Sequence, residues 1–438
     1  MKNEINLMSF LEIQQELENL QKINQNLKCI QIGQSSVKKF PIFCIEISYD
    51  ENEKPIFMLI GGTHGNEAAG IHSLIMLLRE IAVSLNSIYE DFFKNYRLVI
   101  LPCLNPEGYV WARSLYNETG FWGKYGRENE ADQDIGRDLL TLDSSEATAL
   151  LNAYHKYDPV VVISLHEFAK TPLAVARRGW WRAILWDMMI ASVAYHPNID
   201  QSIQDLTSEI HKLLIEEVSK TGNRVFDYSD EFGRIYRGHL GASGSNYFGI
   251  CNSISLTFET SGYDEAEITL KKRANLHLAG IKVVFKYCIK NKNRILSTVK
   301  KAKLNSKSLK RLVFKSKPKI RKVSIKGKMT DSYTFKKNFQ INGKKIIAVQ
   351  KVVFQGPDYE VEEWIDVPEA YVIYFPSTAF KKKLSNHGIF YEEINDDVVH
   401  KIIVKASQPY SRLIPMLLDP RLKIKNRPCL DTLVELSF

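Results

Sequence analysis

Short apolar runs and amphipathic stretches alternate along the first two thirds of the chain. Several of the apolar runs lack strict polar–apolar alternation, which is typical of strands buried on both faces. The predicted strands are residues 40–48, 55–62, 96–106, 159–168 and 253–262, and the predicted helices are residues 68–85, 144–157, 200–220 and 264–287. This alternation predicts an α/β domain with a mixed, mostly parallel sheet.

The pattern changes after about residue 292. Residues 290–328 contain 16 Lys or Arg and no Asp or Glu, so the formal net charge of +9 is concentrated there. The strands predicted beyond are residues 322–329, 333–341, 344–354, 369–375 and 400–406, and the one clear helix is residues 377–388. We therefore expect three units: an α/β domain over residues 1–292, a basic linker over 293–321 and a small β-rich domain over 322–438.

The basic stretch, residues 290–328, has two interpretations. A solvated linker or exposed helix is the simpler one. The alternative is a surface that binds an anionic polymer or anionic lipid. Nucleic acid is a poor match, because the single aromatic residue among the charges, Phe314, does not make the series of aromatics that a single-strand binding platform needs.

Composition and the first residues bear on location. With 45% hydrophobic and 25% charged residues, the chain resembles an ordinary globular protein. No apolar run approaches the roughly 18 residues of a membrane span. The first 21 residues read as an amphipathic helix without signal-peptide features, so we expect a cytoplasmic protein, or a periplasmic one if a leader is missing. Six scattered cysteines without a CxxC motif indicate reduced, buried thiols.

Polar side chains stand where four of the predicted strands end. His64 and Glu67 follow the strand at 55–62, and Asn105, His166 and Glu259 close three others. Ligands collect at the carboxyl ends of strands in open α/β sheets. Each residue alone is a weak signal, since a single His in an apolar strand is usually a core residue. Their joint placement at strand ends predicts one shared site.

The chemistry of this set favours a metal. Two imidazoles and one carboxylate, from His64, Glu67 and His166, leave the fourth tetrahedral position of Zn²⁺ open. Zinc would acidify a water molecule and polarise a substrate carbonyl. A carboxylate outside the ligand set must then carry the proton to the leaving amine, and Glu259 is the candidate. Arginines can clamp a substrate carboxylate or stabilise an oxyanion.

Five motifs carry a family resemblance, in the same order as in the family. They are "GGTHGNEAAG", "LPCLNPEGYV", "DIGRDLL", "VVISLHEF" and "SLTFETSG". From about residue 40 to 290 the chain resembles the zinc carboxypeptidases and their relatives, the succinylglutamate desuccinylases and aspartoacylases. The resemblance implies a mixed eight-stranded sheet flanked by helices. It also implies one zinc ion per chain on His64, Glu67 and His166, with Glu259 as general base.

The resemblance also suggests substrate contacts. The family's Asn-Arg pair for the substrate carboxylate falls on Gly136 and Arg137, so the arginine is kept and the asparagine is not. Asn105 lies in the matching "NPEGY" segment. The arginine that polarises the scissile carbonyl is matched by Arg113, with Arg127 as second choice.

Other family positions match less well. Leu240 stands where carboxypeptidases have a tyrosine, and Tyr236 or Tyr247 could take its place. Asn246 falls near the specificity pocket. Residues 177–186, rich in Trp and Arg, read as a packing segment or as a wall of the substrate cleft.

Three functions remain in competition. The leading hypothesis is a metallocarboxypeptidase that cleaves an amide next to a free carboxylate in a peptide or a peptidoglycan-derived peptide. The second is an N-acyl amino acid deacylase with the same metal site, which the missing asparagine favours. The third is a non-catalytic protein that binds anionic polymers through residues 290–328. The intact set of His64, Glu67, His166 and Glu259 argues against it.

Overall fold

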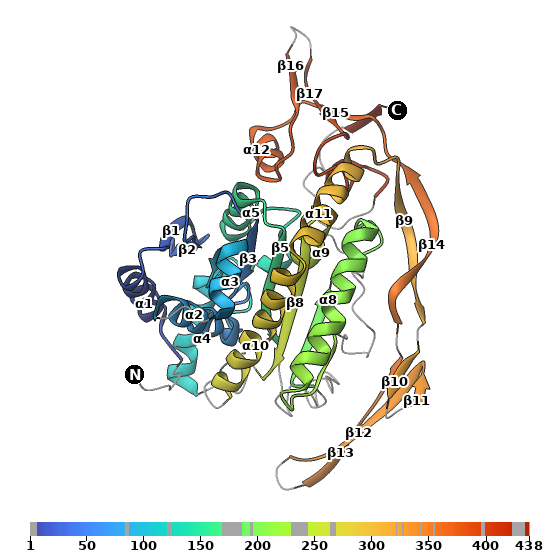
Figure 1. Cartoon of the computed structure of the whole chain (residues 1–438). Coiled ribbons are helices and arrows are strands. Elements are labelled where there is room, and N and C mark those ends of the chain that lie inside the picture. The colour runs from blue at the N-terminus through green and yellow to red at the C-terminus, as the bar shows by residue number, and fades with distance from the viewer. Residues whose placement is uncertain are drawn as a thin grey trace.

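The chain is described from a computed structural model (Figure 1). The described residues are 7–83, 87–120, 122, 125–168, 186–192, 196–228, 244–262, 269–320, 322–325, 328–341, 344–353, 355–395, 399–422 and 434–437. In the first domain the strands are β1 (Leu27–Gln34), β2 (Pro41–Ile47), β3 (Ile56–Ile60), β4 (Arg97–Leu101), β5 (Val161–Phe168), β6 (Met188–Ser192), β7 (Val225–Asp227) and β8 (Ile254–Ser261). The helices are α1 (Phe10–Ile23), α2 (Ala68–Val83), α3 (Ser87–Asn95), α4 (Pro106–Thr119), α5 (Ser145–Tyr157), α8 (Gln201–Ser219), α9 (Gly244–Ile250) and α10 (Leu270–Lys290), with the 3-10 turn η1 (Ile135–Arg137).

All eight strands form one sheet in the order β1-β2-β4-β3-β5-β8-β6-β7. The central strands β4, β3, β5 and β8 are mutually parallel, whereas β2 pairs antiparallel with β4 and β6 pairs antiparallel with β8. Every residue of β3 is buried, in agreement with the unbroken apolar run that predicted it. The predicted mixed, mostly parallel eight-stranded sheet is confirmed.

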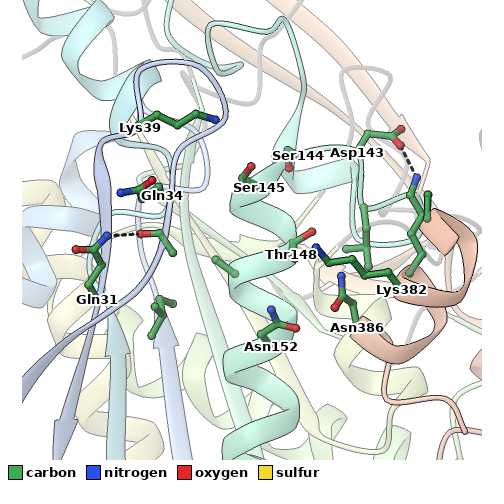
Figure 2. Close-up of a pocket in the computed structure, with 16 residues that line it drawn as sticks. Gln31, Gln34, Lys39, Asp143, Ser144, Ser145, Thr148, Asn152, Lys382 and Asn386 are labelled. Carbon is green, nitrogen blue, oxygen red and sulfur yellow. Dashed lines mark hydrogen bonds and ion pairs between the residues drawn. The ribbon is translucent and has the colours of Figure 1, made fainter.

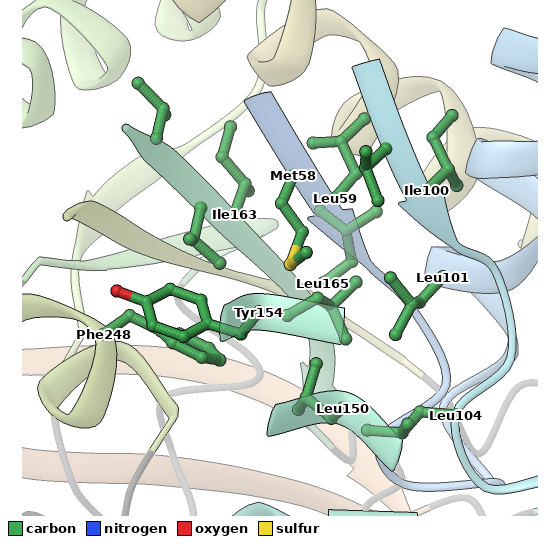
Figure 3. Packing of buried hydrophobic residues seen from close by; sticks show 14 of the residues in the cluster. Met58, Leu59, Ile100, Leu101, Leu104, Leu150, Tyr154, Ile163, Leu165 and Phe248 are labelled. Atoms are coloured by element: carbon green, nitrogen blue, oxygen red, sulfur yellow. The ribbon is translucent and has the colours of Figure 1, made fainter. Parts of the chain in front are cut away.

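Two groups of helices flank the sheet. Helix α10 contacts α2, α3 and α8, and Phe285 of α10 stacks on Phe92 of α3 at 4.0 Å between ring centroids. Helices α5 and α9 form the second group. Tyr154 of α5 and Phe248 of α9 lie 4.8 Å apart and pack beside Leu165, as Figure 3 shows. Large buried side chains on both groups fix the parallel strands and therefore their carboxyl ends.

The basic stretch is folded, not an irregular connection. Residues 293–321, for which we expected a solvated linker or an exposed helix, make up nearly all of α11 (Lys292–Lys307) and the whole of β9 (Arg311–Ile320). Helix α11 buries Ile295, Val299, Ala302 and Ser306, and this helical stripe packs toward α8. The apolar positions recur every three or four residues among the lysines, whose charged ends stay on the exposed side.

The remaining residues form small antiparallel sheets, as expected for a β-rich domain. The strands are β10 (Val323–Ile325), β11 (Lys328–Thr330), β12 (Ser332–Ile341), β13 (Lys344–Val353), β14 (Gln355–Asp366), β15 (Ala370–Tyr374), β16 (Glu392–Asn395), β17 (His400–Lys405) and β18 (Val434–Ser437). Strands β9 and β14 pair, and a four-stranded sheet has the order β16-β17-β15-β18. Besides the predicted helix, α12 (Thr378–Asn386), the domain contains α13 (Leu413–Leu418), which the pattern did not reveal because all six residues are buried.

Buried polar contacts join this domain to the first. Arg412 donates to Asp200 Oδ2 at 3.0 Å and to Ser306 Oγ at 2.6 Å, and Asn305 also donates to Asp200 at 3.1 Å. At the exposed edge of the contact, Lys383 of α12 pairs with Asp143 at 2.7 Å. The two parts of the chain therefore share an interface that contains charged groups shielded from solvent.

Within the described residues, no single helix is long and apolar enough to cross a membrane. Helices α2 and α3 would pass that test only as a pair, by length and composition, and they are bent by 94° relative to each other. The described cysteines are all free and, except for the half-buried Cys29, buried. Cys429 lies outside the described residues.

Candidate metal centre and active site

The loop that follows β3 carries the first two site residues. Backbone bonds tie it to the loop after β4, because Leu104 N donates to Gly61 O at 3.0 Å and Asn105 N donates to Gly62 O at 2.7 Å. Gly65 allows the closest approach: a Cβ there would lie 2.0 Å from the backbone nitrogen of Tyr109. The sequence around His64 is therefore glycine-rich because this loop packs directly on the start of α4.

His64, Glu67 and His166 meet at the carboxyl ends of β3 and β5. His64 Nδ1 lies 2.8 Å from Glu67 Oε1, and His166 Nδ1 lies 2.8 Å from Glu67 Oε2. The two Nδ1 atoms are 3.1 Å apart. All three side chains are largely buried, with exposed fractions of 7% for His64, 3% for Glu67 and 13% for His166. Among the described residues this is the His, Cys, Asp and Glu group whose ligand atoms gather tightly enough for a metal.

A further carboxylate orients His64. Asp134 Oδ1 lies 3.2 Å from His64 Nε2, on the opposite side of the ring from Glu67. Burial opposes ionisation of Asp134, but the hydrogen bond and charge of His64 and the charge of Arg127 hold the pKa of Asp134 well below its usual range. A carboxylate in this position fixes the ring and its tautomer, leaving Nδ1 directed at the ligand set. We did not predict this role for Asp134, although it stands in the "DIGR" motif.

Arg127 is the arginine that reaches the ligand set. One of its terminal nitrogens lies 3.2 Å from His64 Nδ1 and 3.4 Å from Glu67 Oε1, and the other donates to Asp134 Oδ2 at 3.1 Å. Burial alone would lower the pKa of Arg127, but the charges of Glu67, Asp134 and Glu259 raise it. Its guanidinium is therefore fixed as a cation at the edge of the site.

Arg113, our first choice for that role, lies elsewhere. It is half-buried in α4, and its charge acts on Glu12 of α1 and on His72 of α2. The structure thus brings the second choice, Arg127, to the ligand set. The sequence could not rank the two arginines, because both follow the "NPEGY" motif. The path of the backbone after α4 brings Arg127 to His64 and Glu67.

Glu259 stands next to a metal ligand across the sheet. Strands β5 and β8 are parallel, and their register pairs His166 with Glu259. Paired residues on neighbouring strands project from the same side of a sheet. Glu259 is half-buried, and its charge is felt by Arg127. The register of β5 and β8 therefore places Glu259 beside His166 at the ends of their strands.

A buried ion pair next to the ligands fixes the position of α2 relative to β5. Glu167 accepts from the backbone nitrogen of Ala69 at 2.8 Å and from Arg273 Nε at 2.6 Å. Glu167 follows His166, and Ala69 lies two residues after Glu67. Burial raises the pKa of Glu167, with Arg273 opposing that rise. This contact locks the first turn of α2 onto β5, and with it the relative position of two ligands.

The predicted substrate residues differ in exposure. The Arg137 side chain is 70% exposed and lies 3.5 Å from Asp134 Oδ2. Gly136 packs on His64, since a Cβ there would lie 3.0 Å from His64 Nε2. The absence of asparagine at this position therefore goes with a tight approach of η1 to His64.

Two predicted asparagines are buried. The Asn105 side chain accepts from Gly108 N at 2.9 Å and donates to the Arg127 carbonyl at 3.2 Å. It caps α4 and holds the Arg127 backbone, so its contacts here are internal. Asn246 is 1% exposed in α9, which packs against β5 and β8.

The remaining candidates fall away from the ligands or outside the described residues. The Tyr247 hydroxyl lies 2.9 Å from His387 Nδ1 of the second domain, so this tyrosine faces the domain interface. His72 bonds to the Ala68 carbonyl and the Met8 amide, which is a structural role. Tyr236, Leu240 and most of 177–186 lie outside the described residues.

The ligand set fits zinc. Two ligands at about 2.0–2.1 Å from Zn²⁺ in a tetrahedral site are about 3.3 Å apart. Here the two imidazole Nδ1 atoms lie 3.1 Å apart, and each lies 2.8 Å from one oxygen of the Glu67 carboxylate. Two imidazole nitrogens and one carboxylate are also the donor types of catalytic zinc sites. The eight-stranded sheet therefore carries a candidate zinc site, His64, Glu67 and His166, at the carboxyl ends of its parallel strands.

Comparison with known proteins shows which family the chain resembles. The zinc carboxypeptidase family model matches residues 13–146. Carboxypeptidase 2 of Trichophyton rubrum is 24% identical over 277 residues, which are 60% of this chain and 48% of the relative. The chain thus spans about half the length of the curated relatives it matches.

Solved structures agree on the fold. Carboxypeptidase A of Helicoverpa armigera aligns with a TM-score of 0.50 and 16% identity, over 66% of this chain and 77% of that chain. Thrombin activatable fibrinolysis inhibitor aligns with a TM-score of 0.51 and 15% identity, over 65% and 78%. The chain is therefore similar to zinc carboxypeptidases in sequence over residues 13–146, and it shares their fold.

Proposed function

We propose that this protein is a zinc-dependent carboxypeptidase that hydrolyses an amide bond next to a free carboxylate. The observation that carries the proposal is the juxtaposition of His64, Glu67 and His166, with Glu259 in register beside His166. A ligand set alone would suit a structural metal. The second carboxylate beside it supplies the proton acceptor that hydrolysis needs.

Each side chain has a distinct task in this proposal. Zinc, when bound to His64, Glu67 and His166, supplies a Lewis acid that polarises the scissile carbonyl and acidifies water. Glu259 takes the proton of the attacking water and returns it to the leaving amine. The Arg127 guanidinium donates to the oxygen that becomes negative in the transition state. Asp134 positions His64.

Arg137 is our candidate for binding the substrate carboxylate. Its side chain is 70% exposed, and its Nε lies 3.5 Å from Asp134, which in turn contacts His64. An arginine fork can bind a carboxylate by two hydrogen bonds, and doing so would place the adjacent amide near the metal. A peptide or a peptidoglycan-derived peptide would present such a carboxylate.

An N-acyl amino acid is the second candidate substrate. Gly136 stands where the family has asparagine, so Arg137 lacks its usual amide partner for anchoring a peptide terminus. Binding of an anionic polymer by residues 290–328 stays a prediction. Lys315 and Lys317 of β9 pair with Glu360 and Glu362 of β14, which reduces the charge available to such a polymer.

A substrate panel tests the proposal. Dipeptides, muropeptides and N-acyl amino acids are incubated with zinc-loaded protein, with and without a chelator. We expect chelator-sensitive hydrolysis of at least one class. Glu259→Gln should keep zinc and lower kcat by about 10³-fold or more, whereas Glu217→Gln on the outer side of α8 should not. Full activity of Glu259→Gln would remove Glu259 from the mechanism, and inactivity of the wild type on all three classes would refute the proposed function.

A further inference from the structure

His387 of the second domain reaches into the first. It ends α12 and is fully buried. Its Nε2 lies 3.2 Å from the Leu140 carbonyl, and its Nδ1 lies 2.9 Å from the Tyr247 hydroxyl. A carbonyl can only accept, so Nε2 carries the hydrogen and Nδ1 accepts from Tyr247. Burial lowers the pKa of His387 to about 3, which keeps the ring in this neutral form at pH 7.

The two partners of His387 flank candidate substrate-binding residues. Leu140 lies three positions after Arg137, and Tyr247 adjoins Asn246. Helix α9, which carries Asn246 and Tyr247, packs against β5 and β8, the strands of His166 and Glu259. One imidazole ring therefore joins two separate segments of the first domain, each next to a residue predicted to contact substrate.

Hydrogen bonds of the Asp138 side chain hold the segment after Arg137 in a compact loop. The Asp138 carboxylate accepts from Asp143 N at 2.9 Å, from Ser144 N at 2.7 Å and from Ser144 Oγ at 2.6 Å. These bonds fix the shape of residues 138–144 but not their position relative to α9. His387 supplies a buried bond that does so.

The other contact of α12 with this segment is more exposed. Lys383 pairs with Asp143 beside a cleft of about 820 Å³ that runs between β1, α5 and α12 (Figure 2). The two side chains are 27% and 57% exposed, and exposed ion pairs add little. Lys383 is therefore a matched control for His387 on the same helix.

We infer that the β-rich domain is part of the substrate-binding machinery, with His387 as a positioning residue that holds the Arg137 segment against α9. The inference rests on the proposed function. A carboxylate clamp displaced by about 1 Å loses much of its effect on an adjacent reaction centre. The second domain thus helps to set how tightly the substrate carboxylate is held, without touching it.

Kinetics of single and double variants test the inference. For a substrate with a free carboxylate, His387→Ala should raise KM by about tenfold while kcat changes less than about threefold and zinc content is unchanged. Lys383→Ala should leave KM unchanged. In an Arg137→Ala background, His387→Ala should add little, because its effect passes through Arg137. A KM rise of the same size in that background, or an unchanged KM in folded His387→Ala, would overturn the inference.

Two further measurements keep the test decisive. If His387→Ala does not fold, Tyr247→Phe removes only the hydroxyl and should raise KM by about two- to threefold, and an unchanged KM would then overturn the inference. Amide hydrogen exchange needs no turnover: in His387→Ala, exchange of residues 139–144 should be faster than in Lys383→Ala. A wild type without hydrolysis but with this exchange difference would refute the proposed function and leave the buried contact standing.

Discussion

At the scale of single residues, the site depends on which polar groups meet. His64, Glu67, His166 and Glu259 could be predicted, because each stands at the end of an apolar run whose strand character is plain from the sequence. Asp134 and Arg127 could not be ranked in the same way. They lie in the irregular connection between α4 and α5, where the path of the backbone decides which side chain reaches His64.

Arg127 and Arg113 give a direct test of that assignment. We expect Arg127→Ala to lower kcat/KM by about 10²- to 10³-fold, since it removes a donor from the forming oxyanion. Arg113→Ala, which changes the same residue type on α4, should stay within about threefold of wild type. Steady-state kinetics on one substrate measures both. A large loss in Arg113→Ala with a small one in Arg127→Ala would reinstate our first choice.

At the scale of secondary-structure elements, the positions of the ligands depend on how α2 and β5 are joined. The sequence predicted both elements, since the apolar runs and the helical spacing are clear. It did not reveal that Glu167 and Arg273 form a buried pair, because a Glu beside a ligand and an Arg in a distant helix have no shared pattern. The charge count left a linker and an exposed helix both open for α11, because its buried stripe is hidden among lysines.

The buried pair predicts a large effect on stability. Arg273→Met leaves the Glu167 carboxylate without its cation in an environment that is closed to solvent. We expect the free energy of unfolding to fall by roughly 3–5 kcal/mol. The neighbouring Lys272→Met removes an exposed pair with Asp187 and should cost no more than about 1 kcal/mol. Urea unfolding compares the two variants, and equal midpoints would contradict the role given to Arg273.

At the scale of the whole molecule, both domains contain buried histidines, and two of these, His155 and His387, lie where the domains meet. Burial lowers the pKa of His72 and His155 to about 4 and that of His277 and His387 to about 3. His155 packs against Tyr410 of the second domain. The sequence predicted a β-rich domain but not this interface, because the residues that form it are more than 100 positions apart in the chain.

These histidines predict a loss of stability in mild acid. Their ordinary pKa is 6.5, so below that value the unfolded chain binds protons that the folded chain does not. Stability is fully present above pH 6.5 and falls as the pH drops toward 4. We expect the urea midpoint to decrease between pH 7.5 and 5.5, where carboxylates remain ionised. His155→Gln should flatten this decrease and the more exposed His400→Gln should not; a pH-independent midpoint would contradict the assignment.

The zinc content of the purified protein tests the central claim most directly. If His64, Glu67 and His166 hold one ion, metal analysis should find about one zinc per chain in the wild type. His166→Ala should lose most of it, whereas His400→Ala should retain it. An unchanged zinc content in His166→Ala, or a wild type that takes up no zinc, would contradict the account of this site.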